Sequence, residues 1–210
     1  MVDFQKRDRP GDREADDGGD SDDEQEPEGH DHGEDGDHDG HDHADHDHHA
    51  HDVDDLGIAV LTVSSSRSRD DDPSGDIIVS AVEGAGHEVT VRDLVNDDRD
   101  TVQRVVATLV GRGDVDAVVT TGGTGVTPDD VTVEAVRPLF DKRLPGFGEL
   151  FRDRSREEVG TKVVGTRATA GIADGAPVFC LPGSANAARL GIEEIILEQV
   201  GHLAGLARRD

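Results

Sequence analysis

The chain of 210 residues has one cysteine, no tryptophan and no tyrosine. Because Cys180 stands alone, neither an intrachain disulfide nor a cluster of metal-bound thiolates can form, and this favours a cytoplasmic location. No stretch reaches the roughly 18–20 apolar residues that cross a bilayer. The first residues also lack the apolar segment of a secretory signal. We therefore expect a cytoplasmic protein without a membrane partner.

Basic residues are scarce as well. The 21 lysines and arginines face 48 acidic residues, and the formal net charge is −27. We do not expect nucleic acid as a partner, because a protein needs a basic surface to bind a phosphate backbone. Composition rich in acids and poor in lysine and aromatics is typical of salt-loving organisms, since salt screens the self-repulsion of such a chain. A halophilic archaeon is the expected source.

Charge divides the chain into two parts. Residues 1–55 contain 23 acidic residues, four basic residues and nine of the eleven histidines. This segment has too little apolar surface to offset its ordering entropy, so we expect residues 1–54 to be a disordered acidic, His-rich tail. The histidines of 30–52 could bind zinc, nickel or cobalt loosely, or they are a compositional bias in a solvated tail. Residues 55–210 suit one compact domain.

Short apolar runs alternate with helical patterns along this domain. The alternation predicts an α/β fold in three layers, α/β/α, with a mostly parallel central sheet. We expect strands at 56–63, 87–95, 115–120 and 176–181, and helices at 76–83, 145–159 and 185–206. Two further helices are expected, one capped by Asp100 or Thr101 and one that Pro128 begins.

Residues 120–130, TTGGTGVTPDD, are the most informative segment. A glycine-rich turn between a strand and a helix lets backbone N–H groups approach an anion, so the segment favours a phosphate-bearing ligand over a plain tight turn. Val126 and Thr127 stand where a P-loop has Lys and Ser or Thr, and Pro128 replaces the third glycine of the dinucleotide motif. Asp130 is a candidate magnesium ligand. Alternatively, Asp129 or Asp130 only complements the helix dipole.

Four polar turns follow the predicted strands, at 64–75, 96–98, 120–130 and 182–184. In parallel sheets, ligands bind outside the carboxyl ends of the strands. We expect these turns to meet at one edge of the sheet and to form the binding site there.

The segments of this domain, in this order and spacing, resemble the MoaB branch of the MoaB/Mog family of molybdenum cofactor biosynthesis proteins. The resemblance covers about residues 56–205 and is carried by TGGTG at 121–125, PDDVT at 128–132, PGFGELF at 145–151, SREEVG at 155–160, RATAG at 167–171 and LPGS at 181–184. The opening segments 62–67 and 72–75 favour the MoaB branch over the Mog branch.

The resemblance implies a reaction, in which the terminal phosphate of molybdopterin attacks the α-phosphate of ATP and pyrophosphate leaves with the help of magnesium. Such catalysis relies on positioning and electrostatics rather than on a nucleophilic side chain. The resemblance also implies a homo-oligomer, a trimer or hexamer, and a downstream metal-insertion protein. The alternatives are a non-catalytic molybdopterin carrier on the same fold and a metal-handling protein that uses the tail.

By resemblance, Asp130 and Asp97 are the catalytic residues, and each either binds magnesium or positions the substrate. Asp97 also fits an ordinary turn. Arg167 is a weaker candidate that fits a structural ion pair equally well. The chain departs from the family at Asp129, where many members carry arginine, and this loses a cation beside the phosphate loop. The resemblance assigns substrate binding to Thr121, Gly122, Gly123, Thr124, Gly125, Glu149, Ser155, Pro182, Gly183 and Ser184. Glu149 fits an exposed acidic residue of a helix equally well, and Ser184 is also a candidate helix cap.

Overall fold

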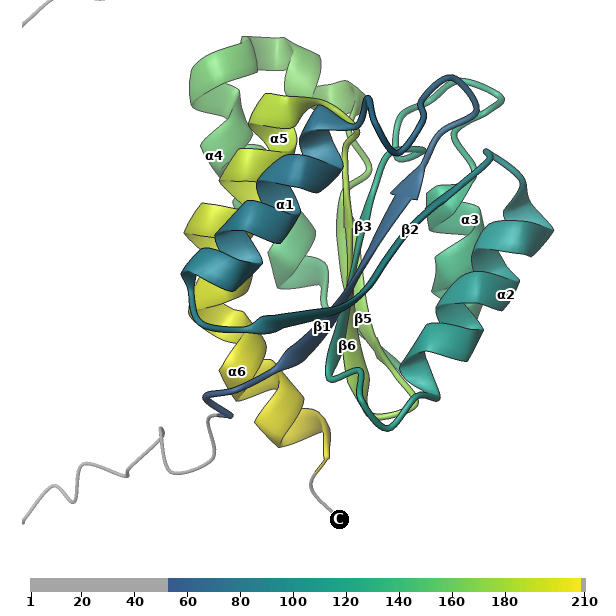
Figure 1. Cartoon of the computed structure of the whole chain (residues 1–210). Coiled ribbons are helices and arrows are strands. Elements are labelled where there is room, and N and C mark those ends of the chain that lie inside the picture. Colours follow the sequence, from purple (N-terminus) through teal and green to yellow (C-terminus); the bar gives the residue numbers. More distant parts are fainter. Residues whose placement is uncertain (1–52, 209–210) are drawn as a thin grey trace, which may run out of the picture. The chain divides into compact units, whose positions relative to one another are not determined.

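The computed structural model describes residues 53–208 (Figure 1). Within these residues, helices cover both faces of a single six-stranded sheet. The predicted acidic tail, with its metal-binding histidines, lies almost wholly outside the described range. No helix of the described part is long and apolar enough to cross a membrane.

The sheet has the strand order β2-β1-β3-β6-β5-β4. Four strands run parallel, as predicted: β1 (Gly57–Val63), β2 (Glu88–Val95), β3 (Ala117–Thr121) and β6 (Ala176–Leu181). β5 (Thr169–Ala173) pairs antiparallel with β6, and β4 (Lys142–Arg143) pairs antiparallel with β5, so the sheet is mixed. The sequence did not predict β4 and β5, because β4 has two residues and β5 consists mostly of small ones.

Two groups of helices enclose the sheet (Figure 1). One face carries α1 (Pro73–Gly84), α4 (Pro145–Val159), α5 (Ala185–Gly191) and α6 (Leu197–Ala207), and the other carries α2 (Arg99–Val110) and α3 (Thr132–Val136). Successive residues of the central strands enter the two cores in turn: Ile58 and Val60 face the first group, Ala59 and Leu61 the second. The three layers thus follow from strands that are apolar on both faces.

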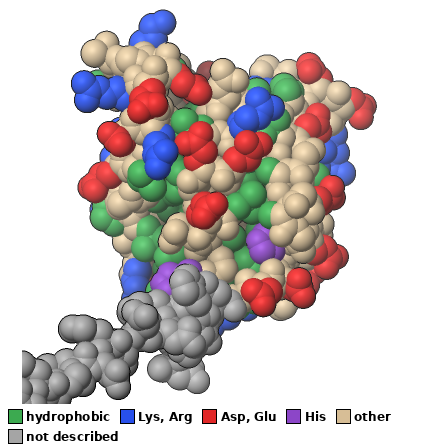
Figure 2. Space-filling model, turned by 90° about the vertical axis from the view of Figure 1, so that its left-hand side faces the viewer, with side chains coloured by type: hydrophobic (Ala, Val, Ile, Leu, Met, Phe, Trp, Pro, Cys, Tyr) green, Lys and Arg blue, Asp and Glu red, His purple; other side chains and the backbone are tan. Residues whose placement is uncertain are grey.

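The outer face of the first helical group is polar. Figure 2 looks onto this face and shows acidic and basic side chains interspersed over apolar surface. The helices therefore bury one apolar stripe each against the sheet and present charge to solvent.

Several helix boundaries differ from the predicted ones. α1 begins at Pro73 with Asp72 as its cap, and the cap of α2 is Asp98 rather than Asp100 or Thr101. The helix expected after the glycine loop is present as α3, but its predicted start at Pro128 is wrong, since residues 128–129 form a turn and α3 begins only at Thr132. The side chain of Asp130 explains this, because it holds the loop in a turn, as described below.

The C-terminal helical segment is continuous from Ala185 to Ala207 and closely matches the predicted 185–206. A π-helical stretch at Ile192–Ile196, η3, separates α5 from α6. Two short 3-10 segments, η1 (Arg137–Leu139) and η2 (Gly160–Gly165), follow α3 and α4. The prediction that Ser184 caps the C-terminal helix is confirmed, because Ser184 Oγ accepts a hydrogen bond from the Ala187 N–H at 3.3 Å, at the start of α5.

Truncation of Phe179, on β6, should strongly destabilise the core between the sheet and the first group of helices. Its side chain is 1% exposed, and its ring centroid lies 5.3 Å from that of Phe147 on α4. We expect Phe179→Ala to lower the free energy of unfolding by about 3–5 kcal/mol, measured by urea denaturation at fixed salt. Val164→Ala is the control, because Val164 is 84% exposed. A loss no larger than that of the control would contradict this packing.

Candidate functional site

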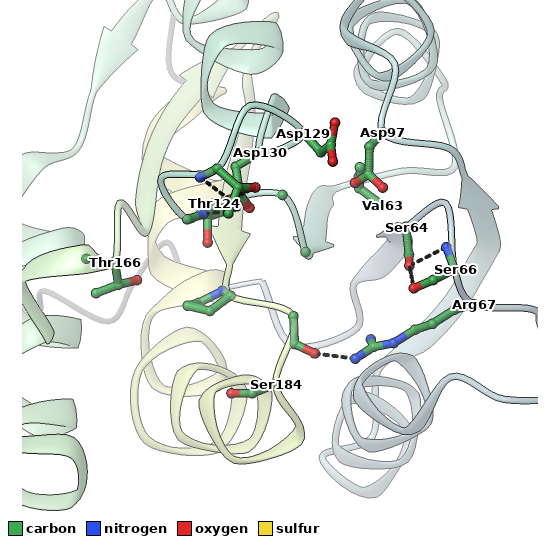
Figure 3. A pocket seen from close by; sticks show the side chains of 17 residues that line it. Val63, Ser64, Ser66, Arg67, Asp97, Thr124, Asp129, Asp130, Thr166 and Ser184 are labelled. Atoms are coloured by element: carbon green, nitrogen blue, oxygen red, sulfur yellow. Dashed lines mark hydrogen bonds between the residues drawn. The ribbon is translucent and has the colours of Figure 1, made fainter. Parts of the chain in front are cut away.

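A cleft of about 610 Å³ lies at the carboxyl edge of the sheet (Figure 3). The loops after β1, β2, β3 and β6 all contribute to it, as the sequence predicted. Its lining residues are Val63, Ser64, Ser66, Arg67, Asp97, Gly122, Gly123, Thr124, Gly125, Thr127, Asp129, Asp130, Gly165, Thr166, Pro182, Gly183 and Ser184.

The glycine loop passes very close to β1. Gly122 and Gly123 have φ angles of 100° and 64°, which side chains rarely tolerate. A Cβ on Gly122 would lie 2.2 Å from the carbonyl oxygen of Val63, and one on Gly123 would lie 2.3 Å from Thr132 Oγ1. Glycine is therefore required at both positions for the loop to follow this path.

Asp130 organises the loop from within. Its Oδ1 accepts the Gly125 N–H at 2.9 Å, and its Oδ2 accepts the N–H and hydroxyl of Thr127 at 2.8 and 2.7 Å. Burial raises the pKa of Asp130, but these hydrogen bonds and the charge of Arg167 together outweigh it, so the pKa lies below its ordinary value. The carboxylate therefore stays ionised, with three of its about four acceptor positions occupied.

Arg167 clamps the same loop from outside. Its Nε donates to Gly125 O at 2.6 Å and its Nη2 to Asp130 O at 2.9 Å, while its main-chain N–H donates to Thr124 O at 3.0 Å. The guanidinium also forms an ion pair with Glu134. Arg167 therefore forms the predicted ion pair and also fixes the position of the loop.

Asp97 ties the loop after β2 to the loop after β1. Its Oδ2 accepts the Ser65 N–H at 2.6 Å, and its own N–H donates to Ser65 Oγ at 3.1 Å. Asp129, which is exposed, lines the same cleft, and Figure 3 draws both carboxylates in the same part of it. The described residues contain no group of three or more His, Cys, Asp or Glu that could hold a metal alone. Two carboxylates suit magnesium that also binds substrate phosphates.

The sequence reasoning did not single out Arg67, a cation of this cleft. Its Nη2 donates to Gly183 O at 2.7 Å and its Nη1 to Ser74 Oγ at 2.6 Å (Figure 3 shows the first bond). Nη1 also lies 3.5 Å from the carboxylate of Asp72, which is 3% exposed. The serine-rich loop 64–70 contains two arginines, Arg67 and Arg69, and nothing in the sequence marks Arg67 as the one that contacts Gly183, which is distant in the chain.

Asp72 keeps its charge although it is buried. Burial raises the pKa of its carboxyl, but hydrogen bonds from Thr62, Gly75 and Ser74, together with the charge of Arg67, bring the pKa below its ordinary value. The ionised Asp72 caps α1 and holds Arg67 in place. This arrangement supplies a fixed cation to a cleft in which Asp129 adds negative charge.

Two threonine hydroxyls of the cleft have no hydrogen-bond partner in the described chain. Thr124 is 2% exposed, and its Oγ1, like Oγ1 of Thr166, is buried and unpaired. Since buried polar groups are normally paired, these two hydroxyls are available to a ligand or a water in the cleft.

Three predicted site residues lie outside the cleft. Thr121 is buried, and its hydroxyl donates to Pro182 O at 3.0 Å, so it links the loops after β3 and β6. Glu149 lines a second hollow of about 400 Å³, and Ser155 lines an apolar groove of about 410 Å³ between α4 and α5. Thr166 lines both of these hollows as well as the cleft.

The mostly parallel sheet and the glycine-lined cleft at its strand carboxyl ends are typical of α/β proteins that bind a small ligand at this edge. Residues 59–202 match the family model described as "Probable molybdopterin binding domain". The "Molybdenum cofactor biosynthesis protein B" of Halalkalibacterium halodurans is 42% identical over 145 residues, which is 69% of this chain and 85% of that protein.

A curated sequence and a solved structure from Pyrococcus furiosus are also similar. Its "Molybdopterin adenylyltransferase" is 42% identical over 157 residues, 73% of this chain and 90% of that one. The crystal structure of its "tungsten cofactor synthesizing protein MoaB" has a TM-score of 0.67 and 41% identity, over 75% of this chain and 99% of that one. The chain therefore belongs to the molybdopterin-binding family of the MoaB/Mog type.

Two threonines of the loop region provide a matched test of the unpaired hydroxyl. Thr132 Oγ1 donates to Gly122 O at 2.8 Å, whereas Thr124 Oγ1 has no partner. We expect Thr132→Val to lower the free energy of unfolding by about 1–3 kcal/mol, because it leaves a buried carbonyl unpaired. Thr124→Val should leave the free energy of unfolding unchanged or raise it slightly. Equal losses in urea denaturation would show that the Thr124 hydroxyl is bonded inside the protein and is not available to a ligand.

Proposed function

We propose that this protein of molybdenum cofactor biosynthesis is a molybdopterin adenylyltransferase, which transfers AMP from ATP to molybdopterin and releases pyrophosphate. The observation that carries the proposal is the cleft itself, in which the unpaired hydroxyl of buried Thr124 lies on a glycine loop at the strand ends, with Arg67 and Asp97 also lining the cleft. The similarity to the "Molybdopterin adenylyltransferase" of Pyrococcus furiosus supports the same reaction.

The glycine loop supplies the phosphate site. Asp130 occupies the N–H groups of Gly125 and Thr127, and Leu181 O accepts that of Gly122. The N–H groups of Gly123 and Thr124 have no acceptor among the described residues and remain available to phosphate oxygens. Arg67 adds positive charge where negative charge develops on the phosphorus oxygens. Because the loop is already held by Asp130 and Arg167, its donors need little reorganisation during the reaction.

In the reaction, a phosphate oxygen of molybdopterin forms a bond to the α-phosphorus of ATP as the bond from that phosphorus to the pyrophosphate oxygen breaks. The attacking oxygen is already anionic, so no side chain has to remove a proton. Asp97 and Asp129 are the carboxylates that would hold magnesium, which supplies charge neutralisation at the phosphates. Asp130 acts by positioning the loop, since its oxygens are already engaged. This revises the metal-ligand role that the resemblance implied for it.

Asp97→Asn tests the proposed role of this carboxylate. Asparagine can still accept the Ser65 N–H through its side-chain oxygen, so the loop should stay in place while the negative charge is lost. We expect pyrophosphate release that depends on ATP and molybdopterin, assayed in high salt, to fall roughly 100-fold. Asp100→Asn, at an exposed position of α2, is the control and should retain full activity.

The same assay separates a transferase from a carrier. An intact protein that binds molybdopterin and ATP but releases no pyrophosphate would overturn the proposed activity and favour a carrier on this fold. Full activity of Asp97→Asn would overturn the role of Asp97 alone.

A further inference from the structure

The second hollow, of about 400 Å³, is unusually basic for so acidic a chain. It lies between α4, β4 and the segment before β5, and four arginines line it: Arg137, Arg143, Arg152 and Arg167. We call it the arginine pocket. Arg167 pairs with Glu134, but no described carboxylate lies within 4 Å of the other three guanidinium groups. Glu149 is the one acidic residue that lines the pocket. Gathering four arginines beside one lining carboxylate is unfavourable unless further negative charge compensates them.

The position of Arg152 is built into the fold. A Cβ on Gly148, one turn earlier in α4, would lie 3.0 Å from Nη1 and 3.4 Å from Nη2 of Arg152. The same Cβ would lie 2.7 Å from the carbonyl oxygen of Ala168. Glycine at 148 therefore lets the helix approach the segment before β5 and lets the guanidinium lie flat against the helix, where it is only partly exposed.

The arginine pocket adjoins the cleft through residues 166–167. Thr166 lines both hollows, and its buried hydroxyl has no partner in the described chain. Arg167 lines the pocket while its guanidinium and N–H hold Thr124 and Gly125 of the glycine loop. A ligand that extends from the glycine loop past Thr166 thus reaches the arginines.

We propose that the arginine pocket binds the diphosphate part of the nucleotide, the leaving group of the reaction. This inference rests on the proposed function. When the bond from the α-phosphorus breaks, its electron pair goes to an oxygen of the diphosphate, and guanidinium groups stabilise such oxygens through paired N–H donors. Arg67 is the one arginine or lysine among the residues that line the cleft, whereas four arginines line the pocket, so the pocket can compensate the additional negative charge of the diphosphate.

Isothermal titration of the full chain tests the proposal, with inorganic pyrophosphate and AMP as separate probes at one fixed salt concentration. The test variant is Arg143→Gln/Arg152→Gln. The control is Arg104→Gln/Arg189→Gln, which removes the same charge at exposed positions of α2 and α5. We expect the affinity for pyrophosphate to fall at least about tenfold in the test variant only, since it loses charge-assisted hydrogen bonds. The affinity for AMP should stay within about twofold in both variants, because its single phosphate is held by the glycine loop.

Several results would overturn the proposal. An equal loss of pyrophosphate affinity in both double variants, or no loss in either, would show that the pocket arginines are not its site. Competition by molybdate at equal affinity would show that the pocket does not select a diphosphate. A change in oligomeric state of the test variant, seen by light scattering, with unchanged pyrophosphate binding would assign the arginines to a subunit contact. If the test variant does not fold, the single variant Arg143→Gln at an exposed position gives the same comparison.

The two probes distinguish this inference from the proposed function. Arginine-dependent binding of pyrophosphate, without binding of AMP or molybdopterin to the intact chain, would overturn the adenylyltransferase and leave an anion site. Binding of AMP and molybdopterin without arginine-dependent binding of pyrophosphate would overturn only the pocket.

Discussion

The site depends on one carboxylate. Asp130 accepts three hydrogen bonds from its own loop, and without them the loop could continue into the helix that its sequence predicts. Arg167 fixes the same loop from the neighbouring segment through the carbonyls of Gly125 and Asp130. The glycine turn is thus held from both sides before any ligand arrives. Donors held in this way gain more from a developing negative charge than donors that must first reorient.

The distribution of charge around the cleft follows from a second buried carboxylate. Asp72 is ionised inside the protein because three hydrogen bonds and Arg67 support it, and in return it fixes the guanidinium of Arg67 beside Gly183. In a chain of net charge −27, a ligand that carries phosphates would otherwise be repelled. Local placement of a few arginines therefore matters more for binding than the overall charge does.

The sequence predicted the parts of the fold that depend on local pattern. The strand at 176–181 and the helix at 145–159 were predicted to the residue, because apolar runs and helical spacing mark them directly. β4 and β5 were missed, since their conformation depends on partners distant in the chain. The turn at the end of the glycine loop was missed because it depends on hydrogen bonds from Gly125 and Thr127 to the side chain of Asp130, which the hydrophobic pattern does not reveal. The loop residues 122–125 and 182–184 and Asp97 meet in the cleft as expected. Glu149 and Ser155 do not, because α4 carries them to neighbouring hollows.

Thr166 has a consequence for the order of events at the site. Its side chain lies where the cleft, the arginine pocket and the apolar groove meet. A hydroxyl has a single proton to donate, so it can serve an acceptor in one hollow at a time. A ligand that accepts this proton in one hollow therefore leaves the hydroxyl unable to donate to a ligand in either of the other two.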